Sequence, residues 1–197
     1  MGTVLSPPAR CPDVLTGPVT VVSHAQLEQA LTVLGRAVSQ HPGLSQTISD
    51  TIRAAGHAGG IAALGIATRL EHPQPVLAAL RTLITTADID TLYALSAGLP
   101  RHSILLSPIS LTITEALVTR LRAAATTDRD AYLPALAMSV NNLAIRLGEA
   151  GRRAEGLAAA QEAATLYREL AAENPDVFGP AAENAQNLMS ALGEDTP

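Results

Sequence analysis

Histidine is the residue type in this sequence best suited to bind a metal, and it occurs five times within the first 102 residues. No two histidines lie four residues apart on one predicted helix, and no His-Glu-x-x-His motif occurs, so their spacing is unlike that of a metal site. His41, His57 and His72 each follow the end of a predicted helix, where an imidazole can meet the last carbonyl groups. The single cysteine, Cys11, excludes an internal disulfide and a cysteine-based zinc site. We therefore expect no bound metal.

Lysine is absent, because all 13 basic residues are arginine. This absence excludes a P-loop lysine, a Schiff-base lysine and a protein-kinase active site. The glycines between positions 56 and 65 follow no predicted strand, so they indicate helix ends and close packing rather than a phosphate-binding loop. Asp88 and Asp90 stand at the start of a predicted helix, where aspartate caps free N–H groups. We expect no catalytic residue and no cofactor, so the chain is predicted not to be an enzyme.

The elements that position these residues are predicted to be helices. Alanine and leucine, two strong helix formers, contribute 64 of the 197 residues. The proline-rich segment 1–22 is interpreted as a tail, or as an arm that docks through its valines at 19, 21 and 22. Ser23 and Gln26 then form a capping-box signature for the first helix. Five more helices are predicted to begin near Leu44, Ile61, Pro75, Asp88 and either Ser107 or Ser110. The strand candidates 19–22 and 104–106 are too short to predict a sheet.

The second of these helices is predicted to stop at Gly56 and the Gly59-Gly60 pair, before the third begins. From Asp128 onward the helices lengthen and a repeat of about 45 residues appears. The apolar face Leu136, Val140, Leu143 and Leu147 returns as Ala181, Ala185, Leu188 and Leu192. A second helix lies between them, from about 152 to 173, with a buried face predicted at Gly156, Ala160, Ala163, Tyr167 and Leu170. A repeat made of two such helices indicates stacked supersecondary units.

The segment from Tyr132 to Arg153, followed by Leu157 to Leu170, resembles tetratricopeptide repeats of the long, kinesin-light-chain-like type common in actinobacterial signalling proteins. The resemblance covers 128–194, one complete repeat and the first helix of a second. It implies a groove-lining face, opposite Leu143 and Leu147, made of Met138, Asn141, Asn142, Ile145 and Glu149, with Asn187 at the position equivalent to Asn142. An amide on that face can hydrogen-bond the backbone of an extended peptide. The alternative is that the amides satisfy neighbouring helix or loop groups.

We therefore predict an all-α fold of about nine antiparallel helices. A six-helix bundle over 23–127 follows the tail 1–22 and precedes repeats over 128–197. One and a half repeats rarely stand alone, so the six helices are expected to cover one side of them. The last helix has no following helix to cover its apolar face. We expect this edge, which comprises Ala181, Ala185, Leu188 and Leu192, to form a homodimer or to dock to a partner.

The net charge of −5, with no basic patch, disfavours nucleic-acid binding. No stretch reaches the roughly 18 apolar residues of a membrane span, and no signal-peptide pattern is present, so a cytoplasmic location is expected. We expect a non-enzymatic module that binds a protein or peptide in bacterial signalling. One alternative is a regulatory helical piece of a signalling NTPase or transcriptional-regulator system, acting with a separate catalytic partner. Another is a small-ligand or peptide sensor whose Gly- and Ala-rich third and fourth helices line a pocket.

Overall fold

The computed structural model describes residues 23–99 and 103–194, which form nine α-helices and no strand. The predicted tail 1–22, with Cys11 and the strand candidate 19–22, lies outside the described residues, as does His102. The helices are α1 (His24–Ala37), α2 (Leu44–Ala54), α3 (Gly56–Ala67), α4 (Gln74–Thr86), α5 (Ile89–Ala97), α6 (Ser107–Ala125), α7 (Arg129–Glu149), α8 (Arg153–Glu173) and α9 (Pro175–Gly193). The all-α prediction is confirmed. None of the described helices is long and apolar enough to cross a membrane.

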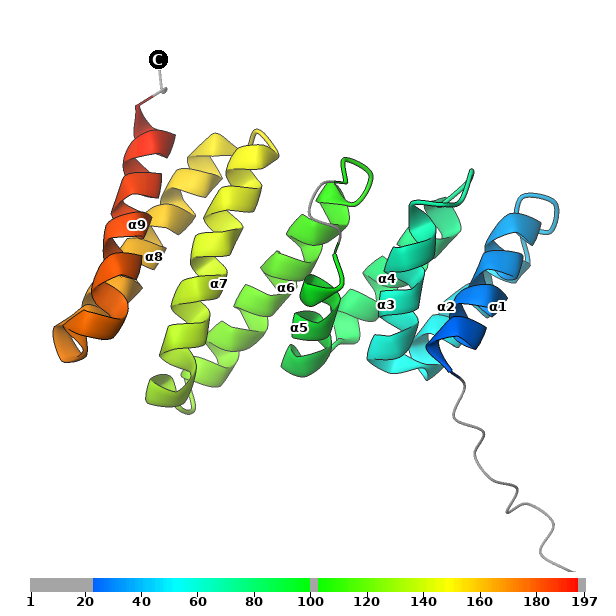
Figure 1. Ribbon diagram of the computed structural model, residues 1–197, viewed down its shortest axis with the longest axis horizontal. Coiled ribbons are helices and arrows are strands. Elements are labelled where there is room, and N and C mark those ends of the chain that lie inside the picture. The colour runs from blue at the N-terminus through cyan, green and yellow to red at the C-terminus, as the bar shows by residue number, and fades with distance from the viewer. Residues whose placement is uncertain (1–22, 100–102, 195–197) are drawn as a thin grey trace, which may run out of the picture.

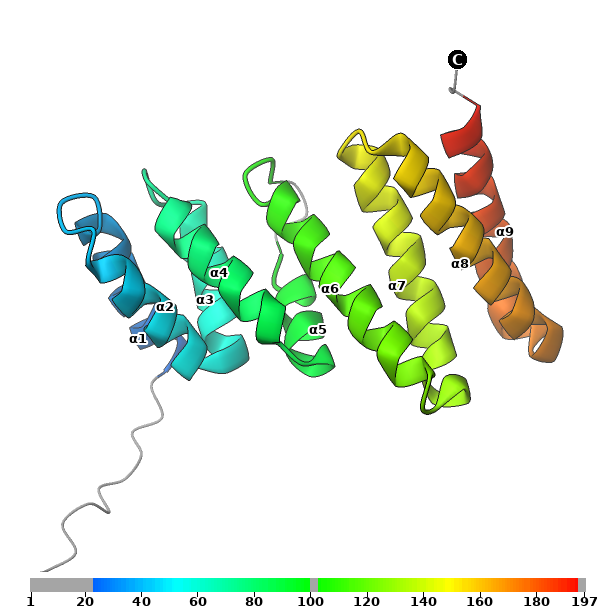
Figure 2. The same cartoon turned by 180° about the vertical axis from the view of Figure 1, so that it is seen from behind.

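The helices form two layers that run side by side along the molecule. The odd-numbered helices lie toward the viewer in Figure 1, and the even-numbered helices lie toward the viewer in Figure 2. Within the first layer α1 packs on α3 and α3 on α5, and within the second α2 packs on α4 and α4 on α6. The first six helices and the last three therefore belong to one antiparallel array. The predicted bundle of the first six helices is solenoid-like. The predicted boundary at 127 is not marked by a break in the core and stays a prediction.

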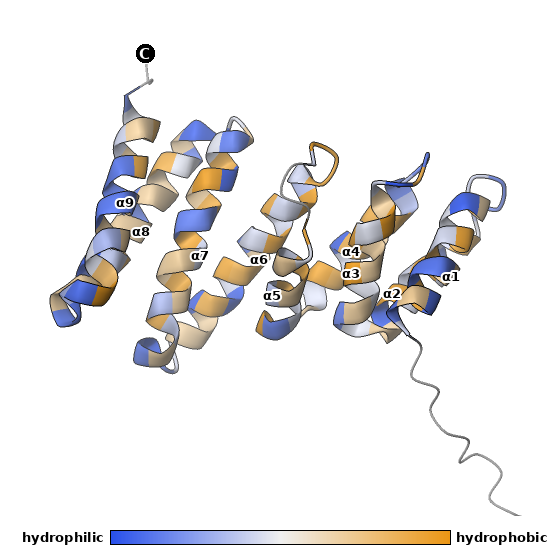
Figure 3. Cartoon of the chain, viewed as in Figure 1, coloured by the Kyte–Doolittle hydropathy of each residue, from blue (hydrophilic) through white to orange (hydrophobic). Residues whose placement is uncertain are grey.

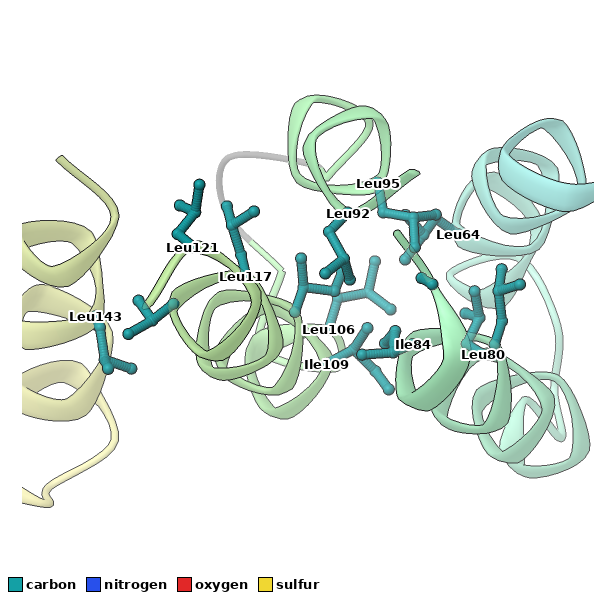
Figure 4. Close-up of a cluster of buried hydrophobic side chains, with 14 of the residues drawn as sticks. Leu64, Leu80, Ile84, Leu92, Leu95, Leu106, Ile109, Leu117, Leu121 and Leu143 are labelled. Atoms are coloured by element: carbon teal, nitrogen blue, oxygen red, sulfur yellow. The ribbon is translucent and has the colours of Figure 1, made fainter. Parts of the chain in front are cut away.

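One hydrophobic core runs along the whole array, from Leu27 in α1 to Leu192 in α9. Figure 4 shows part of it, where leucine and isoleucine side chains from successive helices meet between the layers. Hydrophilic residues are frequent on the two outermost helices of the front layer, α1 and α9 (Figure 3). This distribution is typical of stacked helical repeats, in which each unit buries its apolar face against its neighbours and the end units carry polar outer faces.

Helix starts follow the capping signals in the sequence. The Ser23 hydroxyl accepts a hydrogen bond from the Gln26 N–H at 3.3 Å, and the Gln26 side chain accepts one from the Ser23 N–H at 2.9 Å. Asp88 caps α5 by accepting from the Thr91 N–H at 2.8 Å. Hydrogen bonds from Thr91 hold the pKa of Asp88 below its ordinary value. The predicted capping box and the capping role of Asp88 are both confirmed.

The start of α3 differs from the sequence-based expectation. The helix begins at Gly56, which has a φ of +56°, so Gly59 and Gly60 lie inside α3 instead of ending α2. The reason is packing. A Cβ atom on Gly59 would lie 2.4 Å from the Ile52 carbonyl oxygen, and one on Gly60 would lie 2.4 Å from a methyl carbon of Leu95. The prediction of close packing is therefore confirmed, whereas the prediction of a helix end at this pair is wrong. Residues 104–106 form a turn, not a strand.

The repeat of about 45 residues is visible in the structure. The helices α7 and α9 begin 46 residues apart, and each holds a proline at its sixth residue, Pro134 and Pro180. Val140 and Ala185, which are 45 residues apart, are both completely buried. The whole predicted inner face of α8 is buried: Gly156, Ala160, Ala163, Tyr167 and Leu170. A Cβ on Gly156 would lie 3.1 Å from the Ala144 carbonyl oxygen, and this explains why glycine occupies the position.

Candidate functional site

The main candidate site is a groove of about 430 Å³ between α5 and α7. These two helices belong to the same layer, but α5 does not pack against α7 as α3 packs against α5. The helix α6 lies behind the gap and forms the floor (Figure 1). Three helices therefore supply the lining, which is Tyr93, Ser96 and Ala97 from α5, Ser110, Thr114 and Leu117 from α6, and Met138, Ser139, Asn142, Ile145, Arg146 and Glu149 from α7. We call this lining the α5–α7 groove.

The α7 wall of the groove contains four of the six predicted groove residues. Met138, Asn142, Ile145 and Glu149 all line it. They share one face because their spacing of three to four residues matches the helical period. Met138 is 46% exposed and Ile145 is 39% exposed, although both are large apolar side chains. The same helix buries Leu136, Val140, Leu143 and Leu147 on its other side, as predicted.

The other two predicted residues do not line the groove. Asn141 is half-buried, and its Oδ1 has no hydrogen-bond partner among the described residues. Asn187 is exposed on α9, away from the groove, although it occupies the position equivalent to Asn142. The structure therefore brings Met138, Asn142, Ile145 and Glu149 together, while Asn141 and Asn187 have different surroundings.

The hydroxyl-bearing residues that complete the groove were not predicted from the sequence. Ser110 and Thr114 lie one turn apart on α6, within a helix face that is otherwise apolar, and this interruption was the available signal. The Thr114 hydroxyl donates to the Ser110 carbonyl oxygen at 2.9 Å. On α7, Ser139 is 2% exposed, and its Oγ has no hydrogen-bond partner in the described part of the chain. The groove therefore contains a buried hydroxyl that is still able to donate and to accept.

The only charged residues that line the groove are Arg146 and Glu149, within the described residues. They pair with each other, with Arg146 Nη1 2.9 Å from Glu149 Oε2. Both side chains are about half exposed, at 40% and 52%. The lining of the groove has no net charge, because its single cation and single anion are already paired.

A second cleft lies on the opposite layer, between α6 and α8, and α7 forms its floor through Leu143 and Leu147. Ion pairs bridge it. Arg122 forms two hydrogen bonds to the Glu162 carboxylate, at 3.2 and 2.6 Å. Arg152 contacts both Glu115 at 2.8 Å and Glu155 at 2.6 Å. The guanidinium of Arg152 holds the pKa of Glu155 below its ordinary value. Charged contacts therefore replace apolar packing between α6 and α8.

Histidines and acidic residues do not cluster elsewhere within the described ranges 23–99 and 103–194. No group of three His, Cys, Asp or Glu side chains that could hold a metal occurs in the part of the chain that the structure describes. The small residues of α3 are buried against Ile52, Leu83 and Leu95, so neighbouring side chains occupy the space beside them.

The predicted edge of α9 is partly covered by the chain itself. Ala185 and Leu192 are buried, while Ala181 and Leu188 are half-buried. The equivalence with α7 identifies the uncovered side. On α7, the helix α8 covers Ala144, which is completely buried. The residue 45 positions later is Met189, which is only half-buried. Ala182, equivalent to the buried Ala137, is half-buried too.

Comparisons with known proteins return no match: no protein-family model, no curated protein and no solved structure is significantly similar to this chain.

Proposed function

We propose that this chain is a non-enzymatic interaction module of cytoplasmic signalling, which binds a segment of a partner protein in the α5–α7 groove. The proposal includes a tetratricopeptide-like character for 128–194, as the sequence resemblance implies. The observation that carries it is the shared location of Met138, Asn142, Ile145 and Glu149 on one wall of a groove, because the sequence resemblance implies a ligand-facing role for each of these residues.

The chemistry of the groove supports a binding role. Met138 and Ile145 are exposed apolar side chains beside polar hydroxyl and amide groups. This mixture, apolar surface with a few polar groups that fix orientation, is what recognition sites use. The lining contains no histidine, and its single carboxylate, Glu149, is paired with Arg146 at 2.9 Å. A regulatory piece of an NTPase system would use the same surface, toward its catalytic partner.

The test is the selection of peptides from a displayed random library on the intact chain. An enriched peptide is synthesised with a fluorophore, and its affinity is measured by anisotropy. Asn142→Arg places a long charged side chain in the groove, and we expect it to weaken binding by at least about tenfold. Gln161→Arg makes the same charge change at an exposed position on α8 and should have no effect. Circular dichroism melts confirm that both variants fold.

Two results would refute this function. The first is the absence of any peptide that binds the intact chain. The second is a peptide whose affinity falls equally in both variants, because it would then not bind in the α5–α7 groove.

A further inference from the structure

We propose that the α5–α7 groove selects a peptide segment with no charged side chain in the part that enters the groove; this inference rests on the proposed function and adds the chemical class of the ligand. It follows from the neutral hydroxyls of the lining, from one buried hydroxyl without a partner, and from an ion pair that is already satisfied.

Residues that carry hydroxyl groups line the groove on all three helices. Tyr93 and Ser96 come from α5, Ser110 and Thr114 from α6, and Ser139 from α7. A hydroxyl is neutral, and it can both donate and accept a hydrogen bond. A peptide main chain offers the complementary set, since N–H donors and C=O acceptors alternate along it and carry no charge. The lining is therefore suited to a neutral ligand with both kinds of group.

Ser139 is the residue that most directly indicates a ligand. Ser139 is a lining residue of the groove, it is 2% exposed, and its Oγ has no hydrogen-bond partner among the residues that the structure describes. A buried polar group without a partner is destabilising, so a ligand that pairs with it gains affinity. The nearby Thr114 hydroxyl already donates to the Ser110 carbonyl oxygen, so it offers an acceptor.

The Arg146–Glu149 pair makes the groove unfavourable for charged ligand side chains. The two groups are 2.9 Å apart, so each already has its counter-ion. A ligand carboxylate that approached Arg146 would also approach the like charge of Glu149. A ligand ammonium group that approached Glu149 would likewise approach the like charge of Arg146. A charged side chain would lose water at the groove and would have to compete with the existing Arg146–Glu149 pair for its partner. An uncharged side chain can instead contact the apolar surfaces of Leu117, Met138 and Ile145.

The test uses a peptide that binds the intact chain and loses affinity in Asn142→Arg. Each of its positions is replaced in turn by Ser, Asp and Lys, and affinities are measured by anisotropy. At the positions that enter the groove, we expect both Asp and Lys to weaken binding by about tenfold or more relative to Ser. At the flanking positions all three should bind alike. If Asp or Lys is tolerated at every position, the inference is wrong, although the proposed function stands.

Two protein variants test the residues that carry the argument. Ser139→Ala should weaken peptide binding by about two- to tenfold while leaving the melting temperature unchanged or higher, because it removes a hydroxyl that only the ligand pairs with. Glu149→Gln leaves Arg146 without its carboxylate and should shift library selection toward acidic peptides. Unchanged binding by Ser139→Ala would refute the role of that hydroxyl. Acidic peptides selected by the unmodified chain, and lost in Arg146→Gln, would overturn the inference.

Discussion

Asn141 and Asn142 are adjacent in the sequence, yet the structure gives them different surroundings. Asn142 is exposed and lines the α5–α7 groove, whereas Asn141 is half-buried with an unpaired Oδ1. The rotation of about 100° per residue along a helix separates their side chains. The next residue, Leu143, is 9% exposed and belongs to the core. Three consecutive residues of α7 therefore have three different roles.

The first prediction compares two of these neighbours. Leu143→Ala should lower the free energy of unfolding by about 2–5 kcal/mol, because it removes buried methyl groups and leaves a cavity. Asn142→Ala should change it by only about 0.5 kcal/mol, since the side chain is exposed. Urea denaturation of the two variants and the unmodified chain measures both. A larger loss for Asn142→Ala would mean that the assigned orientation of α7 is wrong.

The second prediction concerns the pH dependence of one ion pair. Arg129 donates hydrogen bonds to Glu169 at 2.7 to 3.0 Å and holds the pKa of Glu169 below 4.5, its ordinary value. A carboxylate with a lowered folded-state pKa stabilises the fold above its unfolded-state pKa, and this contribution is lost as the pH falls through the folded-state value. Glu169→Gln should therefore have a lower urea midpoint than the unmodified chain at neutral pH.

The difference should shrink as the pH falls below 4.5, and Glu173→Gln, which changes an exposed glutamate on the same helix, serves as the control. A difference that stays constant across the acid range would show that the pair makes no pH-dependent contribution. The pair is solvent-exposed, so the effect at neutral pH is expected to be small.

At the scale of elements, the geometry of each helix follows from how closely its neighbours approach. The helix α3 contains three glycines after its first residue, and glycine lowers helix stability by about 1 kcal/mol relative to alanine. A Cβ on Gly65 would meet only the flexible end of the Glu28 side chain, whereas a Cβ on either of the other two would collide with backbone or core atoms of another element. At Gly59 the obstacle is the Ile52 carbonyl oxygen of α2, and at Gly60 it is the side chains of Leu83 and Leu95. Close packing of α3 against α2, α4 and α5 therefore compensates for a poor local helix sequence.

The third prediction separates packing from helix propensity. Gly59→Ala should destabilise the fold by about 1–3 kcal/mol, because the added methyl group meets a backbone atom that cannot rotate away. Gly179→Ala in α9 is the matched control, since no heavy atom beyond its chain neighbours and the nearby backbone of its own helix lies within 4 Å of a Cβ built there. That variant should be stabilised by up to about 1 kcal/mol. Thermal melts measure the stability of both variants. Stabilisation of both would contradict the packing argument.

The fourth prediction concerns the uncovered side of α9. Ala182 and Met189 lie where a following helix would pack, and we expect a homodimer, if one forms, to use this side. Ala182→Glu with Met189→Glu should then convert a dimer to a monomer in sedimentation velocity. Ser190→Glu places a charge on the exposed side and should leave the oligomer intact. A concentrated sample that sediments as a monomer before any substitution would refute self-association.

At the scale of the whole molecule, the array has one junction unlike the others. The helices α1–α6 and α7–α9 are joined mainly by the packing of α6 against α7. The α5–α7 groove lies beside this interface in one layer. The cleft between α6 and α8, which arginine–glutamate pairs bridge, lies beside it in the other layer. A rotation about the α6–α7 interface that widens one opening must narrow the other. We therefore expect the ion pairs of Arg122 and Arg152 to help set the width of the groove.

The fifth prediction tests this coupling by salt. The screening length falls from about 10 Å at 0.1 M to about 3 Å at 1 M ionic strength, so salt should weaken the exposed pairs. Spin labels at Ala97→Cys and Asn142→Cys, in a Cys11→Ser background, report the distance across the groove. We expect high salt to shorten or broaden the distance distribution. Arg122→Gln with Arg152→Gln should show the high-salt distribution already at low salt, and a distance that neither change alters would refute the coupling.

Several features could be predicted from the sequence because they depend on neighbours along the chain. The caps at Ser23 and Asp88, the apolar face of α7 and the inner face of α8 all follow from spacings of three or four residues. The face of α7 opposite Leu143 and Leu147 belongs to this class too, whereas its groove-lining role is implied only by the resemblance to tetratricopeptide repeats. The repeat that relates α7 to α9 could also be predicted from the sequence, because equivalent residues recur at a constant offset.

The remainder was decided by contacts between helices that are distant in sequence. The local propensity of Gly59 and Gly60 predicts a helix end. Their close packing against Ile52 and Leu95 explains why α3 instead continues through these two positions. The α5 wall and the α6 floor could not be assigned, because nothing in the local pattern states that α5 stays apart from α7 while both pack on α6. The apolar face of each helix can be predicted from the amino-acid order alone, since it depends on a fixed rotation per residue. Which polar faces meet across a groove depends instead on the volumes of side chains packed between helices far apart along the chain, and these contacts exist only in the folded protein.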